Sequence, residues 1–333
     1  MGIRLSNNIS VNRQLELIII MSANKVAIVF PGQGSQAVGM LGDLAVNYSQ
    51  IQETFDEASE SLGRDLWALA QNGPAEKLNQ TQNTQPLVLT ASVAMWRVLQ
   101  SQLDIKPVLM AGHSLGEYTA LVCAGSLNFV DAVKLVEQRA MFMQQAVPEG
   151  EGAMAAILGL EVADLIAICD KAAEGEVVSA VNFNAPGQVV IAGNTAAVNR
   201  AIDLAKEQGA KRALPLPVSV PSHCALMLPA AEKLLDAMSR VDFVSPNVPV
   251  LHNTNVAEHS NVADIQQALG QQLHTPVRWV ETVETMANAG VNVLIECGPG
   301  KVLSGLNKRI DKSLELYSSG DERSFNKIVE GLL

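Results

Sequence analysis

Short apolar runs of strand length alternate with longer stretches of helical periodicity along most of the chain. The strand-like runs lie at 26–30, 108–111, 250–253 and 291–297. Apolar residues recur at helical spacing in the stretches between them, at about 48–62, 84–102, 115–124, 129–146, 226–240, 263–273 and 279–289. This alternation predicts an α/β protein with a mostly parallel sheet.

The middle of the chain has a different order of elements. It runs as strand, helix, two strands, helix and strand, at 153–158, 162–173, 177–183, 188–192, 194–208 and 213–218. We expect Asn194 to cap the second helix, because its side chain can accept hydrogen bonds from free amides of the first turn. The β-α-β-β-α-β order is typical of a ferredoxin-like unit.

These patterns predict a division of the chain into parts. Residues 25–150 and 220–315 would form a large α/β domain, 151–219 an inserted small subdomain, and 316–333 a C-terminal segment. The first twenty residues end in an apolar run that is too short for the core of a signal peptide. We interpret residues 1–20 as an extension outside the fold, consistent with an upstream start codon.

Composition narrows the class of protein. The chain has 333 residues, of which 48% are hydrophobic and 17% charged, with a net charge of -11. This length permits a sizeable core and more than one domain, and the apolar content argues against disorder. The acidic balance argues against general nucleic-acid binding, because phosphate backbones attract basic surfaces.

The cysteines and the hydropathy bear on the compartment. Cys123, Cys169, Cys224 and Cys297 are widely spaced and form no Cys-x-x-Cys pair, so a zinc or thioredoxin-type site has no support. We expect reduced thiols in a cytoplasmic protein. No stretch reaches the ~20 apolar residues of a membrane span, so no membrane association is expected.

The strongest chemical signal is the pentapeptide at 112–116, Gly-His-Ser-Leu-Gly, which matches G-x-S-x-G. A strand-like run enters it and an apolar helical stretch leaves it, which is the context of a nucleophile elbow. Such a turn presents the serine hydroxyl at the sheet edge, with the helix amino terminus aimed at it. The alternative is an ordinary glycine-rich entry to a helix. We predict that Ser114 is a nucleophile.

A serine nucleophile needs a base, because its hydroxyl reacts weakly at neutral pH. His223 lies between an extended segment and a helix, where α/β proteins often place catalytic groups; a capping or buried structural role is the alternative. His113 lies inside the elbow, and we expect its side chain to point away from that of Ser114. The remaining histidines are in polar loop regions or precede Thr-Pro-Val: His252, His259 and His274.

Arg139 is the only charged residue in one apolar stripe of the helical stretch 129–146. The other members of that stripe are Ala132, Leu135, Phe142 and Ala146. Arginine is rarely buried without an anionic partner, because an unpaired buried charge is costly. The partner is either internal, such as a glutamate, or a ligand carboxylate held by the guanidinium fork.

The loop Pro-Gly-Gln-Gly-Ser-Gln at 31–36 follows the first strand and fits the G-x-G-x-x-G/A pattern of dinucleotide sites. Such a site needs an acidic residue about 20 positions later, at the end of a second strand. Glu53 and Asp56 are at that distance but lie in a helical pattern. We therefore reject the cofactor interpretation. The amides of Gln33 and Leu115 are instead a natural pair of donors for an oxyanion.

Taken together, these motifs resemble the malonyl-CoA:acyl carrier protein transacylases of bacterial type II fatty acid synthesis. The resemblance spans about residues 25–312 and rests on motifs in family order: VFPGQGSQAVGM, GHSLGEYTAL, VEQRAMFMQ, NFNAPGQVVIAG, VPSHCALM, QLHTPVRWVETV and ECGPGKVLSGL. It implies a hydrolase-like α/β core with a ferredoxin-like insertion. Residues 1–20 lie outside it.

The resemblance also implies a role for each matching residue. Ser114 would accept the acyl group and His223 would be its general base. Arg139 would bind the malonyl carboxylate, and Gln33 and Leu115 would supply the oxyanion amides. A further residue, Gln272, would help to orient His223, in the place where other triads have aspartate.

The implied reaction transfers malonyl from malonyl-CoA to the phosphopantetheine thiol of acyl carrier protein, without metal or redox cofactor. The stretch 220–223, Val-Pro-Ser-His, favours malonyl over methylmalonyl. A trans-acting polyketide acyltransferase and a serine hydrolase are the alternatives. Because carrier proteins are acidic, we expect a locally basic docking face, although solvated surface charge explains most such residues. Its candidates are Lys211, Arg212, Lys301, Lys308 and Arg309.

Overall fold

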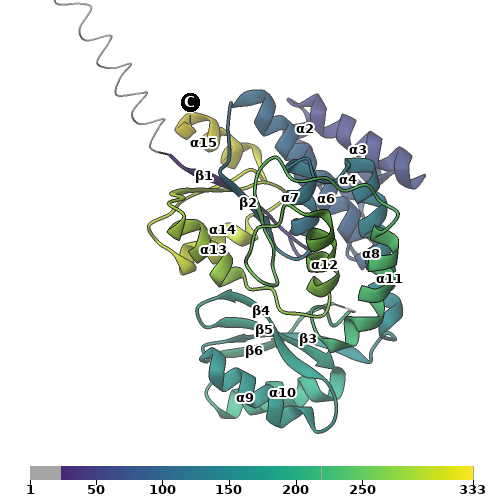
Figure 1. Cartoon of the computed structure of the whole chain (residues 1–333), viewed down its shortest axis with the longest axis vertical. Coiled ribbons are helices and arrows are strands. Elements are labelled where there is room, and N and C mark those ends of the chain that lie inside the picture. Colours follow the sequence, from purple (N-terminus) through teal and green to yellow (C-terminus); the bar gives the residue numbers. More distant parts are fainter. Residues whose placement is uncertain (1–23, 219, 333) are drawn as a thin grey trace, which may run out of the picture.

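Two β-sheets organise the protein, as the computed structural model shows for residues 24–218 and 220–332 (Figure 1). A five-stranded sheet has the order β7-β2-β1-β8-β9, and every neighbouring pair in it is parallel. Its strands are β1 (Val26–Phe30), β2 (Leu109–Gly112), β7 (Val250–Leu251), β8 (Val293–Glu296) and β9 (Glu315–Ser318). The predicted α/β class with a mostly parallel sheet is confirmed. The expected extension 1–20 lies outside the described residues.

Helices cover both faces of this sheet. Within the described residues they are α2 (Gly42–Ala45), α3 (Ser49–Leu62), α4 (Leu66–Asn72), α5 (Ala75–Leu78), α6 (Thr81–Gln102), α7 (Gly116–Cys123), α8 (Phe129–Ala146), α11 (Leu228–Met238), α12 (Val262–Gln272), α13 (Trp279–Asn288), α14 (Val302–Ile310) and α15 (Glu322–Leu332), with a 3-10 turn at Ala225–Met227. The expected helical ranges match α3, α6, α7, α8, α11, α12 and α13 to within a few residues, whereas α14 and α15 were not expected.

The central strand β1 explains why its sequence is continuously apolar. Ile28 and Phe30 point into the larger core with α6, α7 and α8, whereas Ala27 and Val29 point into the core with α13 and α14. All four side chains are fully buried. A parallel strand covered on both faces has no solvent side, so its pattern does not alternate.

The smaller sheet is antiparallel, with the order β4-β5-β3-β6. Its strands are β3 (Gly152–Leu158), β4 (Val178–Ala185), β5 (Gln188–Asn194) and β6 (Arg212–Pro215). The helices α9 (Val162–Ala173) and α10 (Thr195–Glu207) pack on its outer face, at the lower end of the molecule in Figure 1. The opposite face turns toward the large sheet and carries Met154, Val190 and Ala192, which pack with Cys224.

Asn194 does not cap α10 with its side chain, which corrects our expectation. It occupies the N-cap position, but its Oδ1 accepts a hydrogen bond at 2.8 Å from the backbone amide of Val177, beside the edge of β4. The amide of Val177 lies close enough to compete successfully for that oxygen. The side chain therefore ties two strands together instead of satisfying the helix.

A proline inside α6 interrupts the hydrogen bonds of that helix. Pro86 has no amide hydrogen, so the carbonyl of Gln82 loses its usual helical partner. Nη2 of Arg64 donates to that carbonyl at 3.2 Å and satisfies it. The preceding residue, Gln85, is 1% exposed and points into the interior of the large domain.

Candidate active site

The turn that carries Ser114 is a strained strand-to-helix connection between β2 and α7. Ser114 has φ 52, a left-handed conformation that residues with a Cβ rarely adopt. A Cβ on Gly116 would lie 2.1 Å from the carbonyl oxygen of Phe30, and one on Gly112 would lie 1.9 Å from Gly116. Both glycines of G-x-S-x-G are therefore required by close backbone approach. The Ser114 amide donates to Oδ1 of Asn253 at 2.7 Å, which holds the turn.

His223 lies directly against the Ser114 hydroxyl. Its Nε2 is 2.8 Å from Ser114 Oγ, and its Nδ1 is 2.6 Å from the backbone carbonyl of Gln272. Because a carbonyl oxygen can only accept, the proton must sit on Nδ1. The lone pair of Nε2 then faces the serine hydroxyl, which is the tautomer that a general base needs. His223 is itself strained, at φ 67.

Burial and a neighbouring cation keep His223 neutral. Only 3% of the residue is exposed. Burial is the largest cause that lowers the pKa of His223, the positive charge of Arg139 is the next, and together they bring it to about 3. An imidazole with this pKa is unprotonated at neutral pH and can accept a proton.

Arg139 projects from α8 to the same point. It is 1% exposed, and its Nη2 donates to Ser114 Oγ at 3.3 Å and to Gln272 Oε1 at 3.0 Å. Its Nη1 donates to Gln85 Oε1 at 2.7 Å. None of the ion pairs among residues 24–218 and 220–332 includes Arg139. The predicted burial of this charge is therefore correct, and burial lowers the pKa of its guanidinium.

A cavity of about 120 Å³ opens between the two sheets in front of these groups. Gln33 and Leu115 line it, and neither backbone amide has an acceptor among the described residues. The loop with Gln33 is held close to the elbow, since a Cβ on Gly32 would lie 2.5 Å from the carbonyl oxygen of His113. The side chain of Gln33 accepts from Thr81 Oγ1 at 2.7 Å.

The small sheet and the segment after it form the other wall of the cavity. Met154, Leu216 and Val218 contribute apolar side chains, and Asn182 contributes an amide. The Oδ1 of Asn182 is buried and has no hydrogen-bond partner within the part of the chain that the structure describes. His113 also lines the cavity, but its Nε2 lies 2.8 Å from Asn184 Oδ1 rather than near Ser114.

The predicted residues thus meet at one place. Five of them line the cavity: Gln33, Ser114, Leu115, Arg139 and His223. Gln272 lies behind it, where its backbone carbonyl contacts His223 and its side chain contacts Arg139. Of the other histidines, His252, His259 and His274 do not line the cavity; His252 is buried against Glu117, in contact with the ring of His259.

Three residues of the site were missed by sequence reasoning: Gln85, Glu117 and Asn253. Gln85 and Asn253 are neutral amides, and nothing in their sequence context distinguishes them from structural ones. Glu117 is different, because it is a lone carboxylate in the apolar stretch that follows the elbow. Like Arg139, it is a single charge in an apolar helical stretch, and that pattern is visible in the sequence.

The described residues give no support for a metal site or a membrane-spanning helix. No cluster of histidine, cysteine or acidic side chains suited to a metal ion occurs among residues 24–218 and 220–332. In the same residues, no helix combines the length and apolar character needed to cross a membrane. The four cysteines are free thiols.

A serine hydroxyl on a neutral imidazole, facing unpaired backbone amides, is typical of enzymes that pass an acyl group through a serine. Residues 27–316 match the family described as "Acyl transferase domain". This match covers most of the chain. The protein therefore belongs to the acyl transferase family, and the class inferred from the motifs is confirmed.

Individual relatives within this family share one named activity. A Salmonella typhimurium protein named "Malonyl CoA-acyl carrier protein transacylase" is 61% identical over 288 residues, which cover 86% of this chain and 93% of that protein. An acyl carrier protein S-malonyltransferase from Vibrio cholerae has a crystal structure with a TM-score of 0.89 and 59% identity, covering 92% of this chain and 100% of that one. A malonyl-transacylase in complex with a type II PKS acyl-carrier protein has a TM-score of 0.91 and 54% identity, covering 92% and 100%.

Proposed function

We propose that this protein transfers a malonyl group from malonyl-CoA to the phosphopantetheine thiol of acyl carrier protein, through a malonyl ester on Ser114. One observation carries the proposal. The buried Arg139 guanidinium lies 3.3 Å from Ser114 Oγ and has no carboxylate partner among the described residues. A malonyl group differs from acetyl by a free carboxylate, which is the partner that the guanidinium lacks. The names of the relatives at about 60% identity support the same reaction.

Acylation begins with the Ser114 hydroxyl. Nε2 of His223 takes its proton while Oγ attacks the thioester carbon, and the carbonyl oxygen becomes an oxyanion. The amides of Gln33 and Leu115 are free to stabilise that charge. The carbon–sulfur bond then breaks, CoA leaves with the proton from His223, and malonyl remains on Ser114.

Transfer reverses these steps with a different thiol. The phosphopantetheine thiol gives its proton to His223 and attacks the ester, and the same amides hold the second oxyanion. The carbon–oxygen bond breaks, and Ser114 recovers the proton. No electron transfer occurs, so the reaction that we propose needs no redox cofactor, and its acyl donor is the CoA thioester itself.

The substrate carboxylate also acts on the base. After burial, the charge of Arg139 is the main cause of the low pKa of His223. A malonyl carboxylate paired with Arg139 offsets that charge, so His223 becomes a stronger base when malonyl is bound. Acetyl has no carboxylate and therefore does not increase the basicity of His223. Selectivity for malonyl therefore has a catalytic component as well as a binding one.

The finer structural predictions remain part of the proposal. The order β4-β5-β3-β6 supports a ferredoxin-like subdomain at 151–219, and helices on both faces of the parallel sheet support a hydrolase-like core in 25–150 and 220–315. We treat 316–333 as its C-terminal segment. Free, widely spaced thiols support a cytoplasmic location. The candidate docking residues are all exposed: Lys211, Arg212, Lys301, Lys308 and Arg309.

A serine hydrolase uses the same nucleophile and base, and the fate of the acyl group separates the two functions. Mixing the protein briefly with malonyl-CoA should add the mass of one malonyl group, and Ser114→Ala should abolish this adduct. Adding holo acyl carrier protein should move the group to the carrier instead of releasing malonate. An adduct that survives Ser114→Ala, or malonate as the main product with carrier present, would contradict the proposal.

A further inference from the structure

Glu117, at the start of α7, is a buried carboxylate that the proposed reaction does not use. It is fully buried, as are the three groups that surround it. Its Oε1 is 2.7 Å from Nδ1 of His252, and its Oε2 accepts from the amide of Asn253 at 3.0 Å and from Nε2 of Gln272 at 2.8 Å. A buried acidic side chain, Glu117, therefore lies directly behind the nucleophile Ser114.

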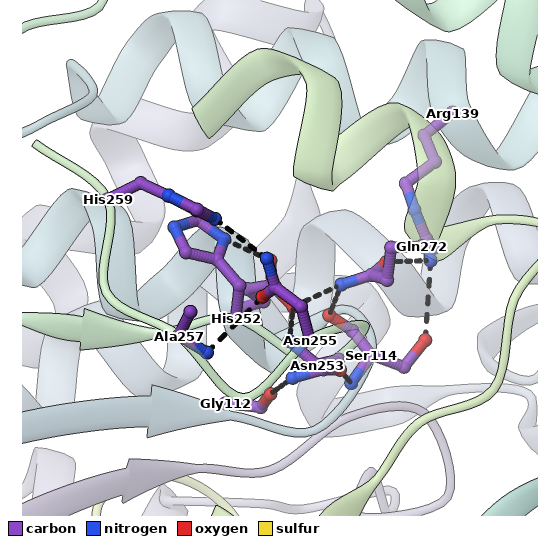
Figure 2. A network of polar contacts seen from close by, with 10 residues as sticks. Gly112, Ser114, Arg139, His252, Asn253, Asn255, Ala257, His259 and Gln272 are labelled. Atoms are coloured by element: carbon purple, nitrogen blue, oxygen red, sulfur yellow. Dashed lines mark hydrogen bonds and ion pairs between the residues drawn. The ribbon is translucent and has the colours of Figure 1, made fainter. Parts of the chain in front are cut away.

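The Gln272 side chain lies between Glu117 and Arg139. Its Nε2 donates to the Glu117 carboxylate and, at 3.0 Å, to the carbonyl oxygen of Ser114. Its Oε1 accepts from Arg139 Nη2 at 3.0 Å. Figure 2 shows the Gln272 amide bridging the backbone of Ser114 and the guanidinium of Arg139, with Asn253 and His252 on the other side of the turn.

Such an amide can take two orientations that differ by a half turn. In the observed one, its NH₂ faces two acceptors and its oxygen faces a cation. After a half turn, the NH₂ would face the Arg139 guanidinium and the oxygen would face the Glu117 carboxylate, so donor meets donor and acceptor meets acceptor. The Glu117 carboxylate, together with the Ser114 carbonyl and the guanidinium itself, therefore favours the orientation that keeps Arg139 bound.

A spacer between the two charges has a further advantage. If Glu117 touched Arg139 directly, it would occupy the guanidinium and compete with a carboxylate from the substrate. One amide between them lets the buried charges compensate one another while an Nη2 hydrogen remains directed at Ser114 Oγ. The Arg139 guanidinium is therefore held in position and can still bind a carboxylate of the substrate.

We propose that Glu117 is a positioning residue that fixes the orientation of the Gln272 amide, and through it directs the Arg139 guanidinium at the acyl group on Ser114. Glu117 thereby contributes to the preference for acyl groups that end in a carboxylate. This inference rests on the proposed function, because it concerns the same cavity and the same substrate.

The test is the ratio of kcat/KM for malonyl-CoA to that for acetyl-CoA, measured from CoA release with holo acyl carrier protein. Glu117→Met removes the acceptors while keeping an unbranched side chain of similar length, and it should lower the ratio roughly 10- to 100-fold, or about 1.4–2.8 kcal/mol at 1.4 kcal/mol per decade. The loss should appear mainly as a higher KM for malonyl-CoA. Glu117→Gln can keep its oxygen on Gln272 and Asn253, so the ratio should stay within about threefold of wild type.

Glu296 provides a matched control outside the cavity. It is a buried carboxylate whose three hydrogen bonds come from the amides of Leu303 and Ser304 and from Ser304 Oγ. Glu296→Met should lower the melting temperature but leave the substrate ratio unchanged. If it lowers the ratio as Glu117→Met does, the effect reports general destabilisation and the inference fails.

Two further outcomes would overturn the inference: an unchanged ratio in Glu117→Met, or an equal fall in Glu117→Gln. Should the methionine variant fail to fold, Glu117→Asp draws the carboxylate away from Gln272 by one methylene and should still lower the ratio; no change there would be equally decisive. Failure of the proposed function looks different, because the wild-type protein would then form no malonyl adduct on Ser114 or would release malonate instead of loading the carrier.

Discussion

The two walls of the cavity differ in the kind of residue that they contribute. The wall built on the parallel sheet and its helices carries polar and charged groups, among them the Ser114 hydroxyl, the Leu115 backbone amide and the Arg139 guanidinium. The wall at the small sheet carries Met154 and Leu216, with one amide among apolar side chains. The first wall provides the reactive groups, whereas the second provides the mainly apolar surface that an acyl chain would contact.

The walls also differ in how firmly they are held. Ser114 and His223 both have positive φ, and such strain persists only where the surroundings over-determine the conformation. Ser114 is held by a parallel sheet with helices on both faces and by Asn253. The small sheet is covered by helices on its outer face only. We infer that reactivity depends on the first wall, and that the second can vary with the acyl group.

Among changes to either wall, removal of the base should have the largest effect on the rate of acylation. His223→Ala leaves the Ser114 hydroxyl without an acceptor, so acylation by malonyl-CoA should slow by roughly 10²–10⁴-fold. Rapid-mixing mass spectrometry of the adduct would measure this rate. His274→Ala is the control, because that histidine does not line the cavity. Acylation at the wild-type rate in His223→Ala would place the base elsewhere.

Removing the cation comes next. Arg139→Ala should cost malonyl transfer about 3–5 kcal/mol, the scale for breaking a buried ion pair, or roughly 10²–10³-fold or more. Acetyl transfer should fall much less, because acetyl has no carboxylate. Arg139→Lys keeps the charge without the planar fork and should lie between the two. An equal loss for both acyl groups would mean that Arg139 is purely structural.

Local sequence was sufficient for most of the long elements, although it missed α14 and α15, and it was insufficient for the short ones. Helix α8 begins and ends at the expected residues because its apolar periodicity runs for several turns and Asn128 caps it. Helices α2 and α5 have four residues each, too few for a period to be visible. The edge strand β9 was also missed, since its existence depends on pairing with β8, which is remote from any local signal.

The residues of the site also divide into those with a local sequence signal and those without one. Ser114 and Arg139 could be found because each breaks a local pattern: a sharp glycine turn and a charge in an apolar stripe. The resemblance implied that Gln272 orients His223, but the group in contact is a backbone carbonyl, which every residue has. No sequence pattern reveals which carbonyl will meet an imidazole after folding.

The low pKa of His223 predicts a smaller effect, on the pH dependence of kcat/KM, and the direction of this effect is clear. Activity requires neutral His223, whose pKa is lowered to about 3 by burial first and Arg139 second. An ordinary histidine with a pKa near 6.5 would lose about 30-fold of kcat/KM by pH 5. Here kcat/KM for malonyl-CoA should stay nearly flat from pH 7 to pH 5. An inflection near 6.5 would contradict this environment for His223.

Protein stability must be followed in the same pH experiment. A histidine whose folded pKa lies below its unfolded value stabilises the fold above about pH 6.5, and this contribution is lost as pH falls toward the folded pKa. His113 and His223 both have lowered pKa values because of burial. Circular dichroism at each pH separates unfolding from protonation of the base.

The smallest effect should come from the apolar wall. Leu216 follows β6, is half-buried and lines the cavity. Leu216→Ala removes apolar volume on the side away from Ser114 and Arg139, so malonyl transfer should fall only a few-fold. Acyl groups with one extra methyl branch should gain relative to malonyl by roughly tenfold, the lower end of what one methylene is worth in an apolar pocket. The measurement is the ratio of kcat/KM for methylmalonyl-CoA to that for malonyl-CoA. If Leu216→Ala instead reduced both substrates as strongly as Arg139→Ala reduces malonyl, the two walls would not have separate roles.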